Sequence, residues 1–178
     1  GSQILRGFDN EIAALVQATM LGRGINIKLG TEIGHIEELN SGGKIGFKLF
    51  CSNGESLNGD HILMAVGRSP NTKDLGLEDA GVITNSTGAI EIDDYQETNI
   101  KGIYAIGDVT NRINLTPVAI RDGIAVIKTI FGSLPTIPDH ELVPSAVFTR
   151  PEIGTIGLTE EEAKKNKKIK VFKTFFKP

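Results

Sequence analysis

The sequence predicts an α/β fold with α+β parts. Three observations lead to this class: helical periodicity near the N-terminus, short apolar runs separated by Gly- and Asn-rich turns, and an apolar run followed by a loop and a helix that opens with Thr116-Pro117. Strand, loop and helix in that order are typical of a nucleotide site in an α/β sheet. The 178 residues are 39% hydrophobic and 23% charged, which suffices for one domain or two small ones.

The N-terminal third is expected to contain one helix and a strand meander. Asp9 can cap a helix that ends near Gly24, and the apolar positions of this helix repeat on one face at Ile12, Leu15, Val16 and Met20. Strands are expected at 25–29, 34–39, 44–50 and 56–65, the last continuing into a buried strand at 61–66. Turns separate them at 40–43 and at Asn53-Gly54, because Asn-Gly favours the positive φ values of a tight hairpin.

The remainder alternates connectors, short strands and two helices. Residues 69–97 are a turn-rich connector with a short strand at 90–92, and a strand at 103–106 stops at Gly107-Asp108. A helix is expected at 116–131, because proline suits the first helical turn. After a linker at 135–138 and a domain boundary near 140, strands are expected at 143–148, 153–157 and 169–176. Thr159 and Glu162 form a capping box for a helix that ends near Asn166.

Composition excludes several classes of function. The net charge of −3, with basic residues clustered only at 164–170, argues against nucleic acid as a partner. The single Cys51 rules out an internal disulfide, and no apolar stretch reaches membrane-spanning length. We therefore expect a cytoplasmic protein with no membrane partner.

Spacing alone points to a ligand site around Asp108. This residue follows a glycine at the carboxyl end of an apolar strand, where open α/β sheets bind ligands, and its carboxylate can accept hydrogen bonds from hydroxyl groups. The helix that begins at Thr116 would offer unpaired N–H groups to an anion or a carbonyl. A turn-capping aspartate and a plain buried helix are the alternatives.

Five segments in this order resemble successive motifs of the pyridine nucleotide-disulfide oxidoreductase family: ILRGFD at 4–9, AVGRSPNT at 65–72, TNIKGIYAIGD at 98–108, LTPVA at 115–119 and AVFTRPEIGTIG at 146–157. Five motifs in register are far more specific than one. The resemblance implies the end of an NADPH-binding domain at 3–66, the returning part of an FAD-binding domain at 67–140 and the start of an α+β dimerisation domain at 141–178. The first two would be pieces of nucleotide-binding three-layer domains.

The resemblance also implies roles in binding FAD. Asp108, with Gly107 before it, would hydrogen-bond the ribitol chain. The helix N-terminus formed by Leu115, Thr116 and Pro117 would face the pyrimidine end of the flavin and stabilise negative charge there.

NADPH would meet a second set of residues. Arg6 would bind the 2′-phosphate through bidentate charged hydrogen bonds, which favours NADPH over NADH. Gly67 and Arg68 would pass beside the nucleotide, and Ala146, near Phe148, would reach the nicotinamide region. A solvated Arg6 and a surface ion pair of Arg68 are the alternatives.

The implied activity is that of a glutathione-disulfide reductase: hydride passes from NADPH to FAD, then electrons pass to an active-site disulfide, and the dithiol reduces glutathione disulfide. Another reductase of the family, of trypanothione or lipoamide type, and a non-catalytic fragment are the alternatives. The redox Cys-x4-Cys is missing, Cys51 has no neighbouring cysteine, and three histidines are scattered at His35, His61 and His140. We therefore expect an internal fragment that holds no catalytic residue, is inactive alone and comes from a homodimeric parent.

Overall fold

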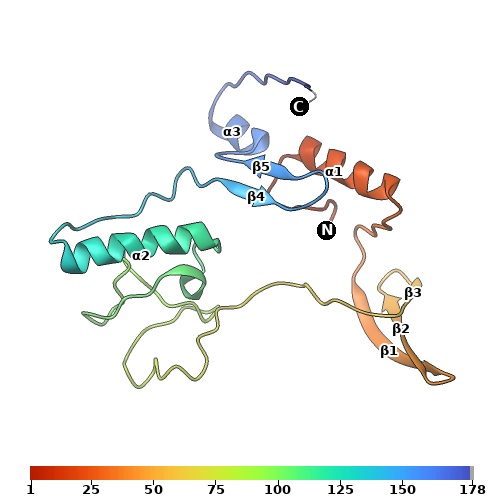
Figure 1. The fold of residues 1–178 in the computed structure, drawn as a ribbon, viewed down its shortest axis with the longest axis horizontal. Helices are drawn as coiled ribbons and strands as arrows, with labels where there is room; N and C mark the ends of the chain where they lie inside the picture. Colours follow the sequence, from red (N-terminus) through yellow and green to blue (C-terminus); the bar gives the residue numbers. More distant parts are fainter. Residues whose placement is uncertain (177–178) are drawn as a thin grey trace. The chain divides into compact units, whose positions relative to one another are not determined.

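The computed structural model describes residues 1–176 and forms two compact units (Figure 1). The first unit joins Gly1–Met64 to Pro144–Pro178, and the second is Ala65–Val143. Helices and strands both occur, which confirms the α/β class with α+β parts.

The first unit opens with helix α1, Asn10–Gly22, as predicted. Ala13 and Val16 are buried one turn apart on the same face of this helix, so burial of a single face stabilises it. The helix stops where Gly24 adopts a φ of 85°, a conformation that glycine reaches without steric cost. The strand expected at 25–29 is absent.

A three-stranded antiparallel sheet follows, in the order β1-β2-β3: Ile33–Ser41, Lys44–Cys51 and Ser56–Gly59. The predicted turns are confirmed. Gly42 and Gly43 have φ values of 60° and 84°, and Gly54 has 83°. Across β1 and β2, the rings of His35 and Phe50 stack with centroids 4.3 Å apart, which supports this register.

The prediction of a buried strand at 61–66 is wrong. Strand β3 ends at Gly59, and the next residues run without strand pairing, with Leu63 91% and Val66 85% exposed. An apolar run becomes a strand only where a neighbouring strand takes up its N–H and C=O groups. Within residues 1–176, no strand lies beside this segment.

The C-terminal part of the first unit holds a two-stranded antiparallel sheet and a short helix. Strands β4, Ser145–Val147, and β5, Ile153–Thr155, lie where strands were expected, although each is shorter than expected, and the two pair antiparallel. Helix α3, Glu160–Asn166, begins at the predicted capping box of Thr159 and Glu162. The strand expected at 169–176 is absent, for the same reason as at 61–66.

The second unit is built from turns packed against one long helix. Its core consists of Val82, Ile90 and Ala105, against which Leu77, Ile92, Ile100 and Val109 pack. The 3₁₀ helix η1, Gly107–Thr110, is followed by α2, Thr116–Phe131, whose predicted bounds are confirmed.

Strands expected at 90–92 and 103–106 are reduced to isolated bridges, Thr84 with Ile90 and Glu97 with Tyr104. Loop carbonyls satisfy the backbone instead, since the Ala105 N–H donates to the Gln96 carbonyl at 3.0 Å and the Ile90 N–H to the Val109 carbonyl at 2.9 Å. None of the helices in the described part of the chain is long and apolar enough to cross a membrane.

Candidate functional site

The turn at Gly107-Asp108 is shaped by contact with α2. Gly107 is buried with a φ of 71°, and a Cβ placed on it would lie 3.0 Å from the Cβ of Ala119. Glycine is therefore required for two reasons, backbone conformation and close approach of the helix. This contact sets η1 against the first turns of α2.

Asp108 pairs with Arg68. The Arg68 guanidinium donates to Asp108 Oδ2 at 2.9 Å, and both side chains remain largely exposed, at 73% and 52%. An exposed ion pair of this kind contributes little to the free energy of unfolding. Stability therefore does not require either side chain to stay in the pair. The sequence assigned these residues to two different cofactors, and the structure brings them together.

Arg68 and Asp108 both line a cavity of about 210 Å³. The cavity is lined by Arg68, Ser69, Pro70, Asn71, Asp108, Val109, Asn111 and Asn114. Asn111 and Asn114 were missed at the sequence level. Asn111 adopts a left-handed φ of 49° and accepts a hydrogen bond from Asn114 Nδ2 at 3.0 Å. The sequence feature that could have indicated them is a pair of asparagines three residues apart in a polar loop.

The N-terminus of α2 is open to a ligand. Leu115 is the N-cap residue in extended conformation, and its side chain makes no capping hydrogen bond. Its carbonyl accepts from Val118 and Ala119, Pro117 has no N–H, and the Thr116 N–H has no hydrogen-bond partner among the described residues. Thr116 and Pro117 are exposed. One free N–H and the helix dipole therefore favour an electron-rich group here.

These features suit a ligand that carries hydroxyl groups and an electron-rich carbonyl. A carboxylate acceptor for hydroxyl groups stands at Asp108, and an N–H donor for a carbonyl stands at Thr116 on the helix that packs against the same turn. Among the described residues, no cluster of three or more histidine, cysteine, aspartate or glutamate side chains could hold a metal ion.

Arg6 occupies a tight turn in the first unit. The Phe8 N–H donates to the Leu5 carbonyl at 3.3 Å, and Leu5 and Gly7 have φ values of 52° and 87°. Arg6 is exposed at position i+1 of this turn, which leaves its guanidinium available.

Other residues assigned to NADPH are also exposed. Gly67 has a φ of 146°, a value that suits glycine. Ala146 lies in β4 opposite Gly154, and Phe148 beyond it is 87% exposed. Arg6 and Ala146 belong to the first unit, and Gly67 and Arg68 to the second.

Cys51 and His140 have structural surroundings. Cys51 is a buried free thiol at the end of β2. His140 lies 2.7 Å from the buried Asp122 of α2, a pairing across 18 residues that no local pattern predicts.

Comparison with known proteins identifies relatives along the whole chain. The family model described as pyridine nucleotide-disulphide oxidoreductase matches residues 1–123, and the dimerisation-domain model of the same family matches residues 143–178. The chain is 45% identical to glutathione reductase, chloroplastic/mitochondrial, of Pisum sativum, covering 99% of this chain and 32% of that protein. It is 40% identical to a Burkholderia cepacia glutathione reductase, covering 100% and 39%.

A trypanothione reductase of Trypanosoma congolense is also 45% identical, with 98% of this chain and 35% of that protein covered. The chain thus spans roughly a third of the length of these relatives. Among solved structures, the HOCl-induced flavoprotein disulfide reductase RclA of Escherichia coli matches with a TM-score of 0.85 and 28% identity, over 93% of this chain and 37% of that one. LpdA of Mycobacterium tuberculosis matches with a TM-score of 0.79 and 27% identity, over 88% and 33%. The chain belongs to the pyridine nucleotide-disulphide oxidoreductase family.

Proposed function

We propose that this chain is the central part of an NADPH-dependent flavoprotein that contains FAD and reduces glutathione disulfide. The observation that carries the proposal is the Gly107-Asp108 turn packed against the open N-terminus of α2, in a chain that is similar to glutathione reductases along its whole length. The family membership supports the reaction class, and the pea and Burkholderia relatives support the substrate.

When bound, FAD would accept hydride from NADPH and deliver electrons to a disulfide. Asp108 would accept hydrogen bonds from flavin hydroxyl groups. For this, the Asp108 carboxylate would either release the Arg68 guanidinium or bind the guanidinium and the hydroxyl groups together. The Thr116 N–H and the dipole of α2 would stabilise negative charge at the carbonyl that they face. Arg6 would select NADPH through its 2′-phosphate, and Arg68 would contact the same nucleotide.

The chain has one cysteine, so the redox disulfide would come from another part of the full-length protein. The match of residues 143–178 to a dimerisation domain supports a homodimer. The cytoplasm stays our prediction for its location. Fractionation of the source cells would test it, with an organelle as the alternative suggested by the chloroplastic/mitochondrial relative.

Flavin content and NADPH kinetics of the full-length protein test the two sets of binding residues separately. We expect Asp108→Ala to lower the flavin-to-protein absorbance ratio, because it removes the acceptor. The matched variant Arg68→Ala should retain flavin and raise KM for NADPH. Loss of flavin in both variants, or in neither, would contradict this division of roles.

A trypanothione reductase is the second candidate, because the Trypanosoma relative is as similar to the chain as the pea enzyme is. Rates of NADPH oxidation with glutathione disulfide and with trypanothione disulfide separate the two.

The isolated 178-residue polypeptide should be inactive. It should also lack flavin, which its absorbance spectrum and intact mass would show. Glutathione-dependent NADPH oxidation by this polypeptide would refute that expectation.

A further inference from the structure

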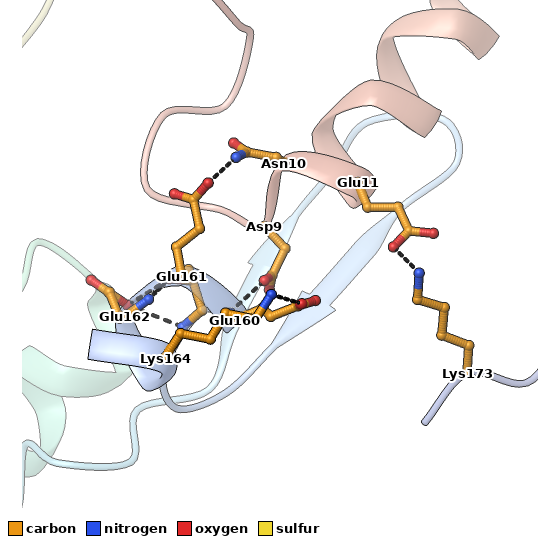
Figure 2. Close-up of polar contacts among 9 residues, drawn as sticks. Asp9, Asn10, Glu11, Glu160, Glu161, Glu162, Lys164 and Lys173 are labelled. Atoms are coloured by element: carbon orange, nitrogen blue, oxygen red, sulfur yellow. Dashed lines mark hydrogen bonds and ion pairs between the residues drawn. The ribbon is translucent and has the colours of Figure 1, made fainter. Parts of the chain in front are cut away.

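Three consecutive residues before and within α1 contact the C-terminal part of the same unit (Figure 2). Asp9 Oδ1 accepts a hydrogen bond from the Glu160 N–H at 2.7 Å. Asn10 donates to Glu161, and Lys173 donates to Glu11. We refer to Asp9, Asn10 and Glu11 as the 9–11 clasp. It joins segments that are about 150 residues apart in the sequence.

Within the clasp, Asp9 is directed away from its own helix. It is the N-cap residue of α1, yet its side chain makes no hydrogen bond to the first turn of α1. In α3, the capping box satisfies the Glu162 N–H through Thr159. The N–H of Glu160, the first residue of α3, donates to Asp9 instead. A carboxylate at a helix N-terminus makes a charge-assisted hydrogen bond and is stabilised by the helix dipole.

The anchored Asp9 lies three residues after Arg6. Three extended residues span at most about 10 Å, and the chain here is shorter still because the Leu5–Phe8 turn is closed by a hydrogen bond. Fixing Asp9 therefore restricts where the exposed Arg6 can lie.

We propose that Asp9 is a positioning residue for Arg6: by binding the first amide of α3, it holds the Leu5–Phe8 turn where the guanidinium meets the 2′-phosphate of NADPH. The inference rests on the proposed function, in which NADPH is the reductant and Arg6 binds its phosphate. It makes the cofactor preference depend on a contact supplied by the segment that matches the dimerisation domain.

The test uses the full-length protein and a matched pair of variants at Glu160. Glu160→Pro removes the N–H that Asp9 binds, and proline is well tolerated at the first position of a helix. Glu160→Ala keeps this N–H and loses the same side chain. We expect Glu160→Pro to raise KM for NADPH about tenfold, which corresponds to the loss of one charge-assisted hydrogen bond. The kcat and the KM for NADH should stay unchanged. Glu160→Ala should match wild type.

Asp9→Ala and Asp9→Asn provide a second pair that does not depend on proline. Alanine should reproduce the NADPH-specific rise in KM, and asparagine, which keeps an acceptor oxygen, should restore most of the affinity. Equal KM for NADPH in Glu160→Pro and Glu160→Ala would overturn the inference. So would equal rises in KM for NADPH and NADH, because a merely structural role would affect both nucleotides.

Arg6→Ala separates this inference from the proposed function. It should raise KM for NADPH and leave KM for NADH unchanged. If wild type shows no preference for NADPH, or if Arg6→Ala does not change it, the proposed use of NADPH fails. If Arg6→Ala behaves as expected and the Glu160 and Asp9 pairs do not, only the positioning role of Asp9 fails.

Discussion

At the residue scale, Gly107 combines a positive φ with a close neighbour. Gly107→Ala adds left-handed strain of about 1–2 kcal/mol and brings a Cβ to 3.0 Å from Ala119. Gly102 has a φ of 83° with nothing within 4 Å, so Gly102→Ala reports the strain alone. We expect the unfolding midpoint of the full-length protein to fall for both variants and to fall further for Gly107→Ala. Equal midpoints would show that α2 can move away at no cost.

The contact of His140 with Asp122 is a second prediction at this scale. The Asp122 side chain is 3% exposed, and His140 Nε2 lies 2.7 Å from its Oδ1. His140→Ala should cost about 3 kcal/mol, because it leaves a buried carboxyl group without its partner. The double variant His140→Ala/Asp122→Ala should be more stable than His140→Ala alone. Denaturant unfolding measures both, and a double variant less stable than His140→Ala would contradict the prediction.

At the scale of elements, α3 should respond to acid through its capping box. The backbone N–H and then the hydroxyl of Thr159 donate to Glu162 and lower the pKa of its carboxyl group below 4.5. A carboxyl group whose pKa is lowered on folding stabilises the helix above its unfolded pKa. This stabilisation is lost as the pH falls through the folded pKa.

Amide hydrogen exchange of Ala163 in α3 would follow this loss. We expect protection to decline on acidification below about pH 4.5 in wild type, and Glu162→Gln to remove that dependence while it keeps the shape of the side chain. Thr159→Ala should lower protection throughout the pH range, since it removes the hydroxyl that accepts from the Glu162 N–H. An identical pH profile in wild type and Glu162→Gln would refute the role of the box.

At the scale of the whole molecule, the second unit leaves an apolar face of α2 uncovered. Ile120, Ile124 and Ile127 are 60%, 52% and 55% exposed, and with Tyr104 and Ile106 they line a cavity of about 800 Å³. Contiguous apolar surface of this kind promotes association.

We therefore expect the isolated 178-residue polypeptide to bind a hydrophobic dye and to self-associate, as measured by fluorescence and light scattering. Ile124→Ser should reduce both signals, and Arg121→Ser, a neighbouring exposed change outside the apolar cavity lining, should not. Equal signals for the polypeptide and the full-length protein would show that this face stays exposed in both.

Local signals were sufficient for part of the fold. Helix α3 was predicted from its capping box, α2 from Thr116-Pro117, and the β1–β2 hairpin from its turn glycines, because each signal acts within a few residues. Helix α1 was predicted in the right place, but the side chain of its expected cap, Asp9, makes no hydrogen bond to it. The assignment of Gly107, Asp108 and Thr116 to a ligand site stays a prediction, made from their order along the chain. The strands expected at 25–29, 61–66, 90–92, 103–106 and 169–176 did not form, because apolar composition does not supply the neighbouring strand that each requires.

The helices, the tight turns and the family could thus be inferred without coordinates, since each depends on residues close together or on the order of motifs. The folded arrangement was needed to show that Arg68 meets Asp108 across 40 residues and that Asp9 binds the first amide of a helix 151 residues away. Such pairings depend on how distant segments pack, and an exposed arginine or aspartate carries no local pattern that names its partner.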